Sequence, residues 1–130
     1  MGSSSTMTDG RSTIPSPRRG DVWLVAFGAA RKGEIGKTRP AVVVTIDELR
    51  RGTAYDRIVV VPLTTNPHQI ATRLQPKIAP GGGLAHDSVV LCDAPRSFVP
   101  SRFVRYLGTV SEGTLSAIVQ ARAMIEGWDD

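Results

Sequence analysis

A series of short β-favouring runs, separated by glycine and proline, constrains the fold of this chain most strongly. The runs are rich in valine, isoleucine and aromatic residues, and they cover residues 21–27, 41–45, 57–63, about 73–78, 88–92 and 105–110. Short runs of this composition between turn-forming residues are typical of strands. One amphipathic helix is expected at residues 112–127. The pattern predicts a mainly β domain with α additions, folded as a small, strongly bent, SH3-like antiparallel barrel with a C-terminal helix.

The length of the chain predicts a single domain. At 130 residues it is long enough to bury a core without disulfides or metals. Residues 1–17 are rich in serine, threonine and proline, so we expect a disordered arm. We expect it to begin with an expression leader at residues 1–5, and Met7 is a plausible native start. The domain itself is expected at residues 18–130. No apolar run approaches the roughly 20 residues that cross a bilayer, and we expect a cytoplasmic protein.

The balance of charges favours an anionic partner. The formal net charge is +4, and 16 lysines and arginines are distributed along the chain. Such a balance suits either a nucleic acid or an acidic protein. The single cysteine, Cys92, excludes an internal disulfide and a cysteine-based metal site, and its apolar neighbours predict a small buried side chain. The sequence contains no metal-binding motif, and we expect neither a metal nor another cofactor.

The stretch at residues 36–44 contains a basic residue at a predicted strand boundary. Arg39 precedes Pro40, and four β-favouring residues follow. Proline is tolerated at the first residue of a strand, and it biases the residue before it toward an extended backbone. We therefore expect the strand to follow Pro40 and Arg39 to point outward at its mouth. A fixed guanidinium at the edge of a cleft suits phosphate chemistry, although a surface arginine beside a strand is the simpler interpretation.

The run at residues 57–63 ends in Thr64, Thr65 and Asn66. Its nearly continuous apolar character predicts a strand that is buried on both faces. Pro62 within the run predicts a bulge or an edge position, since proline lacks the N–H that a central strand needs.

Helical turns are expected at residues 47–51 and 100–102, and the rest of residues 95–102 is expected to be irregular. Ser111 is a suitable N-cap for the closing helix. An apolar stripe along this helix is formed by Leu115, Ile118, Val119 and Ile125. Arg122 falls within the stripe, so it must reach the surface or find an acidic partner.

Four segments occur in a characteristic order along the chain. They are RGDVW at residues 19–23, GKTRPAVVV at 36–44, VVVPLTTN at 59–66 and DSVVLCD at 87–93. A basic turn, LGTVS and the terminal helix follow them. Together these segments resemble the MazF/PemK (Kid) family of toxin endoribonucleases, from about Arg19 to the end of the chain. The resemblance implies the same bent β fold and a symmetric homodimer.

RNA cleavage can proceed without metal, because RNA carries its own nucleophile. A 2′-hydroxyl aligned with the adjacent phosphorus breaks the backbone to a 2′,3′-cyclic phosphate and a 5′-hydroxyl. Arg39 can clamp the negative charge of the phosphorane, and Thr64 can hydrogen-bond a nonbridging oxygen. The resemblance assigns catalysis to these same two residues and leaves the general base open. A catalytic pair of His68 and His86 is the alternative, and neither histidine matches a motif position of the family.

The resemblance also suggests residues that contact the substrate. They are Glu34, Lys37, Asn66, Asp93 and Arg96. The family member Kid places a basic residue where this chain has Leu91, so that role is absent here or is supplied by Arg73 or Lys77. Each of these charged residues can equally be a solvated surface charge. The glycine-rich loop at residues 28–37 is either a lid over the site or a plain connection.

Three functions are compatible with the sequence. The first is a sequence-selective endoribonuclease toxin that cuts single-stranded RNA, acts as a homodimer and is inhibited by an acidic, MazE-like antitoxin. The second is a CcdB-like toxin that inhibits gyrase and would not need Arg39 and Thr64. The third is a non-catalytic RNA-binding module, which would normally display stacking aromatic side chains. Aromatic residues make up only 5% of this chain.

Overall fold

A computed structural model describes residues 16–28, 37–49, 56–65, 75–79 and 83–127. These ranges contain β2 (Asp21–Ala26), β3 (Thr38–Val43), η2 (Asp47–Leu49), β4 (Ile58–Thr64), β5 (Lys77–Ile78), β6 (Ser88–Val90), β7 (Arg96–Phe98), η3 (Pro100–Arg102), β8 (Phe103–Thr109) and α1 (Glu112–Glu126). Residues 1–15 of the expected arm and most of the loop at 28–37 lie outside them. Pro17, at the end of the expected arm, is fully buried.

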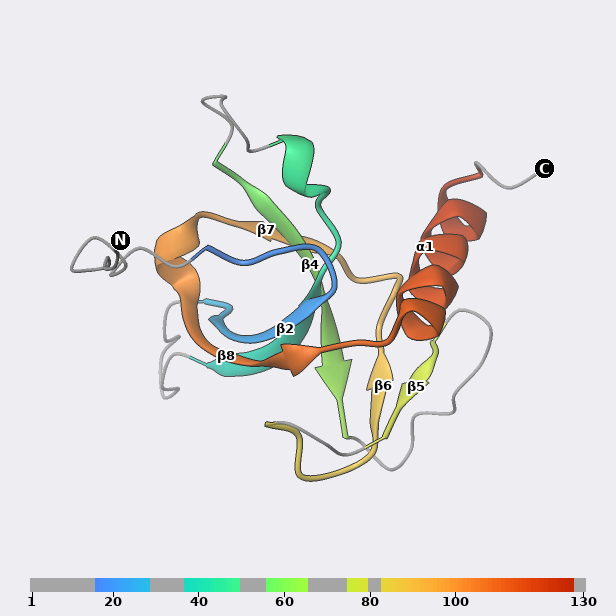
Figure 1. The fold of residues 1–130 in the computed structure, drawn as a ribbon, viewed down its shortest axis with the longest axis horizontal. Coiled ribbons are helices and arrows are strands. Elements are labelled where there is room, and N and C mark those ends of the chain that lie inside the picture. The colour runs from blue at the N-terminus through green and yellow to red at the C-terminus, as the bar shows by residue number, and fades with distance from the viewer. Residues whose placement is uncertain (1–15, 29–36, 50–55, 66–74, 80–82, 128–130) are drawn as a thin grey trace, which may run out of the picture.

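The strands form one curled, antiparallel sheet, and α1 lies beside it (Figure 1). The strand order is β5-β6-β4-β3-β2-β8, and β7 also pairs with β4. The predicted mainly β class with one C-terminal helix is therefore confirmed. No helix in the described part of the chain is both long and apolar enough to cross a membrane.

Strand β4 lies at the centre of the sheet, which contradicts the prediction of a bulge or an edge at Pro62. One edge of β4 pairs with β3, and the other pairs first with β7 and then with β6. Pro62 lies at the change from β7 to β6, where its carbonyl accepts a hydrogen bond of 2.8 Å from the Leu91 N–H. A strand can hold a proline at this point because neither neighbouring ladder needs its missing N–H.

Strand β3 begins three residues earlier than predicted, so Arg39 lies inside a strand and not before it. Arg39 pairs with Val25, and Pro40 pairs with Leu24. The Phe27 N–H donates to the Lys37 carbonyl over 2.9 Å, so these two residues form a hydrogen-bonded pair. Antiparallel pairs alternate between hydrogen-bonded and non-bonded types, and the Leu24–Pro40 pair, three pairs further along, is therefore non-bonded. The nitrogen of Pro40 therefore faces away from β2. The ladder with β4 begins only at Ala41, which explains why Pro40 is tolerated.

Some boundaries shift in the second half of the chain. Residues 96–98, expected to be irregular, form β7 because they pair with the first half of β4. Strand β6 ends two residues earlier than predicted and β8 begins two residues earlier. The helical turn at Pro100–Arg102 is confirmed, as is the turn at residues 47–49. Residues 50–51 of the turn expected at 47–51 lie outside the described residues. So do residues 73–74 of the strand expected at about 73–78.

Side chains from the two faces of the sheet form two hydrophobic cores. The core beneath α1 contains Val22, Val42, Val61, Leu63, Val90, Cys92, Leu107, Ile118 and Ala121. The core inside the curl contains Val25, Phe27, Ala41, Val43, Ile58, Val60, Phe98 and Phe103. Successive residues of β4 contribute to opposite cores, because strand side chains alternate between faces. The predicted burial of this strand on both faces is confirmed.

Helix α1 begins where the sequence predicts. The Ser111 hydroxyl accepts a hydrogen bond of 3.1 Å from the Thr114 N–H, and Gly127 closes the helix with φ of 80°. The predicted apolar stripe is only partly correct, since Ile118 is buried while Val119 and Ile125 are each 37% exposed. The sheet covers a narrower strip of the helix than the sequence period indicates.

Arg122 connects α1 to the turn that follows β6. Its Nη1 donates to the Cys92 carbonyl over 2.7 Å, and its Nη2 forms an ion pair with Glu126. The expectation of an acidic partner is therefore confirmed. Cys92 is a buried free thiol, also as predicted, and burial raises its pKa to about 11, so it is uncharged at neutral pH.

Candidate functional site

The ladder between β3 and β4 ends just before the two predicted catalytic residues. Its last pair is Ala41 with Pro62, and Arg39 and Thr64 each lie two residues beyond that pair. A spacing of two along a strand returns the side chain to the same face of the sheet. Arg39 and Thr64 are thus on one face, at the end of the sheet where the two strands are no longer paired. Arg39 is exposed and Thr64 is half-buried.

The described lysines and arginines fall into two groups. Members of the first group form hydrogen bonds or ion pairs, and they are Arg18, Arg19, Lys77, Arg96, Arg102 and Arg122. The second group, Lys37, Arg39, Arg57 and Arg105, makes no hydrogen bond or ion pair with any described residue and is exposed. A cation of the second group can bind an anion without losing a partner in the described part of the chain.

A cleft of about 230 Å³ opens beside Arg39 and Thr64, and we call it the strand-end cleft. It is lined by Leu24, Pro40, Thr65, Gly83, Leu84, Ala85, His86, Ser88, Arg105 and Leu107. Pro40 and Thr65 are the chain neighbours of Arg39 and Thr64. Because adjacent strand residues face opposite ways, the cleft lies on the other side of the sheet end from the Arg39 and Thr64 side chains.

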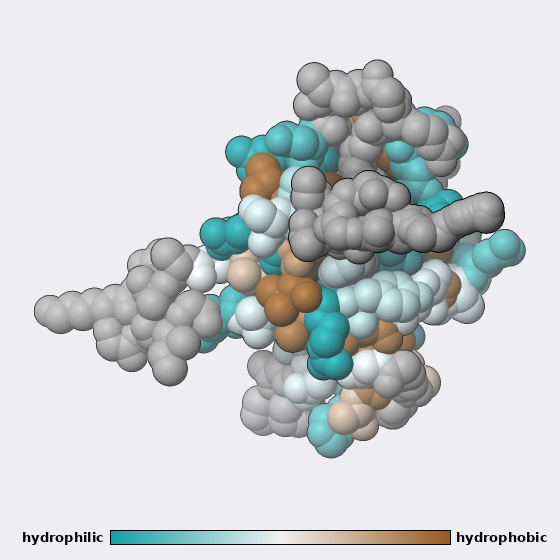
Figure 2. Space-filling view, turned by 60° about the vertical axis from the view of Figure 1, so that its left-hand side comes forward, coloured by the Kyte–Doolittle hydropathy of each residue, from teal (hydrophilic) through white to brown (hydrophobic). Residues whose placement is uncertain are grey.

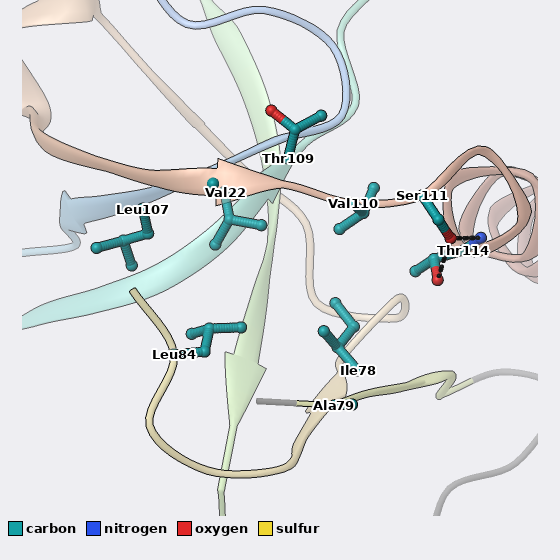
Figure 3. Close-up of a pocket in the computed structure, with 10 residues that line it drawn as sticks. Val22, Ile78, Ala79, Leu84, Leu107, Thr109, Val110, Ser111 and Thr114 are labelled. Carbon is teal, nitrogen blue, oxygen red and sulfur yellow. Dashed lines mark hydrogen bonds between the residues drawn. The ribbon is translucent and has the colours of Figure 1, made fainter. Parts of the chain in front are cut away.

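Two other hollows have their polar groups already engaged. The hollow in Figure 3 has mainly apolar walls, and its Ser111 and Thr114 hydroxyls bond to each other in the cap of α1. A groove between α1 and η2 is bordered by Arg19 and Arg122, whose guanidinium groups bond to backbone carbonyls. The strand-end cleft differs because Arg105 has no partner among the described residues.

The described residues form no broad apolar platform on the side seen in Figure 2. Among the coloured atoms, small hydrophobic patches alternate with hydrophilic side chains. The exposed large hydrophobic residues of the described chain include Val104 and Tyr106 on β8. Polar and charged groups therefore contribute much of the surface available for recognition on this side.

The structure connects Arg96 to the Lys37 end of β3. The Nη2 of Arg96 donates to the Phe27 carbonyl over 3.1 Å, and the Phe27 N–H bonds to the Lys37 carbonyl. The guanidinium also lies over the Phe27 and Phe98 rings, at 5.6 and 5.2 Å from their centroids. Sequence spacing alone gives no sign of this link, since it depends on the curl of the sheet.

No hydrogen bond or ion pair with a described residue links Asp93 to Arg96 or to the Lys37 end of β3. Asp93 is exposed in the turn between β6 and β7. Lys77, one candidate for the missing basic role, pairs with Asp87 over 3.4 Å. The predicted contacts Glu34 and Asn66, the alternative base His68 and the other candidate Arg73 all lie outside the described residues. His86 is exposed at the strand-end cleft.

Arg105 was not among the predicted site residues. The signal for it is a charged residue in a strand that otherwise reads as apolar, and that signal is also compatible with a plain surface position. Within the described ranges, no group of three or more histidine, cysteine or acidic side chains is arranged to hold a metal ion.

Comparisons with known proteins agree on one family. A family model described as PemK-like, MazF-like toxin of type II toxin-antitoxin system matches residues 18–124. Endoribonuclease MazF9 of Mycobacterium tuberculosis is 34% identical over 107 residues, which cover 80% of this chain and 91% of the relative. Endoribonuclease PemK of Escherichia coli is 34% identical over 79 residues, or 61% of this chain and 58% of the relative.

Solved structures share the fold. A mycobacterial endoribonuclease in complex with its cognate antitoxin superimposes with a TM-score of 0.67 at 25% identity, over 86% of this chain and 96% of the other. MazF from Deinococcus radiodurans has a TM-score of 0.62 at 21% identity, over 85% and 96% of the two chains. The chain belongs to the PemK-like, MazF-like toxin family of type II toxin–antitoxin systems, as its four sequence segments indicate.

Proposed function

We propose that this toxin is a metal-independent, sequence-selective endoribonuclease, which cuts single-stranded RNA to 2′,3′-cyclic phosphate and 5′-hydroxyl ends. The observation that carries the proposal is the position of Arg39. It is an exposed cation without a described partner, and Thr64 lies on the same face beyond the last β3–β4 pair. The names of the relatives, MazF9 and PemK endoribonucleases, support the same activity.

In the proposed mechanism, the 2′-oxygen of the RNA attacks the adjacent phosphorus as its proton departs. The bond to the 5′-oxygen breaks, and that oxygen gains a proton. Arg39 stabilises the added charge of the phosphorane through its planar fork, and Thr64 hydrogen-bonds a nonbridging oxygen. Arginine has a pKa above about 12, so Arg39 acts by charge stabilisation or as an acid, and the general base is a different group.

Further substrate contacts are proposed at Glu34, Lys37, Asn66, Asp93 and Arg96. Lys37 and Arg96 belong to the end of the sheet that carries Arg39. A guanidinium has five N–H donors, so Arg96 can keep its bond to the Phe27 carbonyl and still donate to a phosphate. The backbone bond would hold the charge in place, which lowers the entropy lost when RNA binds.

The proposed partners follow from charge and from the family. The related mycobacterial endoribonuclease is solved in complex with its cognate antitoxin. We propose that an acidic, MazE-like antitoxin neutralises exposed cations of this toxin, and that the toxin works as a homodimer in the cytoplasm. Lys37, Arg39 and Arg105 are exposed without described partners, so both RNA and an acidic segment can compete for them.

The test is a cleavage assay in excess EDTA on an RNA and on the same RNA with a 2′-deoxy sugar at the cleaved nucleotide. The normal RNA should be cut to cyclic phosphate ends, while the deoxy substrate should resist, because its nucleophile is absent. Cleavage of the deoxy strand, or loss of activity in EDTA that added metal restores, contradicts the mechanism. Binding of RNA without any cleavage would instead favour a non-catalytic module.

A further inference from the structure

We propose that the strand-end cleft is a nucleotide subsite, in which a base beside the cleaved phosphate lies against an apolar wall and Arg105 binds the acceptor atoms of that nucleotide. This inference rests on the proposed RNA cleavage and adds to it a residue and a position for the neighbouring nucleotide. Neither the sequence motifs nor the predicted contacts include Arg105.

The position of the cleft follows from the two strands that carry the proposed catalytic pair. Pro40 and Thr65 line the cleft, and each is one residue from Arg39 or Thr64. One residue along a strand is about 3.3 Å. The backbone of Arg39 and Thr64 therefore borders the cleft, while their side chains face the other side of the sheet. An RNA strand with its reacting phosphate at Arg39 reaches the cleft by passing around the end of the sheet.

The walls of the cleft have the chemistry of a site for one base. Leu24, Leu84 and Leu107 supply an apolar surface against which a flat ring can lie. Thr65 and His86 add polar groups at the opening, and the His86 ring can stack on a base. The volume of about 230 Å³ is below the roughly 300–1,000 Å³ of sites for drug-sized ligands, as a single-base subsite requires.

Arg105 supplies the charge at this cleft. It lies on β8 opposite Leu24, whose other neighbour across the sheet is Pro40. The β2–β8 register shifts between Leu24 and Val25, so Arg105 lies next to an irregularity in the ladder. Its guanidinium is exposed and bonds to no described residue, so its fork is available to the paired acceptors of a base edge or a phosphate.

Arg57 provides a matched control for Arg105. It is also exposed, has no partner in the described chain, and immediately precedes β4, whereas Thr64 ends that strand. Removing Arg57 changes the net charge as much as removing Arg105 does. The seven residues of β4 place Arg57 about 20 Å or more from the strand-end cleft.

The experiment compares wild type, Arg105→Ala and Arg57→Ala on RNA that carries the 2′-deoxy block, with the dissociation constant measured across a series of salt concentrations. Arg105→Ala should weaken binding by roughly 5- to 100-fold. If the lost contact is to a phosphate, the salt slope should also fall by about 1. Arg57→Ala should stay near wild type, and both variants should keep the wild-type melting temperature because both side chains are exposed.

Cleavage of a randomised RNA pool then separates the two kinds of contact. Relaxed selectivity at one flanking position in Arg105→Ala identifies a base contact, and uniformly weaker cleavage identifies a phosphate contact. Equal behaviour of Arg105→Ala and Arg57→Ala overturns the subsite. A wild-type protein that cleaves no RNA contradicts the proposed function itself, so the two failures are distinguishable.

Discussion

Two regions of this molecule use arginine in different ways. In the first, which we call the closure seam, Arg96 and Arg102 meet the end of β2: Arg96 donates to the Phe27 carbonyl and Arg102 donates to the Ala26 carbonyl over 2.8 Å. Both guanidinium groups also lie over the Phe98 ring. In the second region, the end of β3, Arg39 is exposed and has no described partner.

The difference shows that residue type does not distinguish an arginine whose guanidinium is held by the protein from one that is exposed without a described partner. At the closure seam, strand ends leave carbonyls without ladder partners, and a guanidinium that satisfies them also covers aromatic rings. At the end of β3, Arg39 has no described carbonyl to satisfy, and its charge remains available for a phosphate. The predictions below test this division, from the largest expected effect to the smallest.

Replacing Arg39 should affect activity far more than stability. Arg39→Ala should lower the cleavage rate roughly 10²- to 10³-fold, because a preorganised donor to the developing charge is removed. The free energy of unfolding should change by less than about 0.5 kcal/mol, since the side chain is exposed. Single-turnover cleavage and denaturant unfolding measure the two quantities.

Arg39→Lys is a useful companion variant. It keeps the charge but loses the planar fork, so its cleavage rate should also be poor. A well-folded Arg39→Ala protein with normal turnover would show that Arg39 is not part of the proposed site. The contrast in function between the closure seam and the end of β3 would then no longer hold.

Replacing Arg102 should have the opposite profile. Arg102→Ala deletes a charged hydrogen bond to the Ala26 carbonyl and a contact with the Phe98 ring at 5.8 Å. Hydrogen bonds to charged groups contribute about 1.5–3 kcal/mol, so unfolding should become easier by about 2 kcal/mol. The folded fraction should cleave RNA at nearly the wild-type rate. An unchanged free energy of unfolding, measured with urea, would argue against a structural role.

Arg96 tests whether one arginine can serve both regions. Its side chain is more exposed than that of Arg102, so Arg96→Ala should cost only about 1 kcal/mol of stability. If Arg96 also contacts RNA, KM should rise while the rate at saturation stays close to wild type. A variant with reduced stability and unchanged KM would assign Arg96 to the closure seam alone.

The sequence by itself determined most of what depends on neighbouring residues. Most of the strands, the cap at Ser111 and the burial of β4 on both faces follow from local composition and from the alternation of side chains, whereas β7 does not. Alternation also puts Arg39 and Thr64 on one face once the pairing of β3 with β4 is known. Four ordered segments were sufficient to indicate the family.

Only the tertiary structure decided which strands become neighbours and which partners the arginine side chains have. Pro62 lies in a central strand because β4 changes neighbours there, and Arg39 lies within β3 because the pairing with β2 extends to Thr38. The link from Arg96 to Phe27 joins residues that are 69 positions apart. The position of Arg105 at the cleft depends on its pairing with Leu24, which is 81 positions away. Pairings over such distances depend on how the sheet curls, and no local pattern of residue types encodes them.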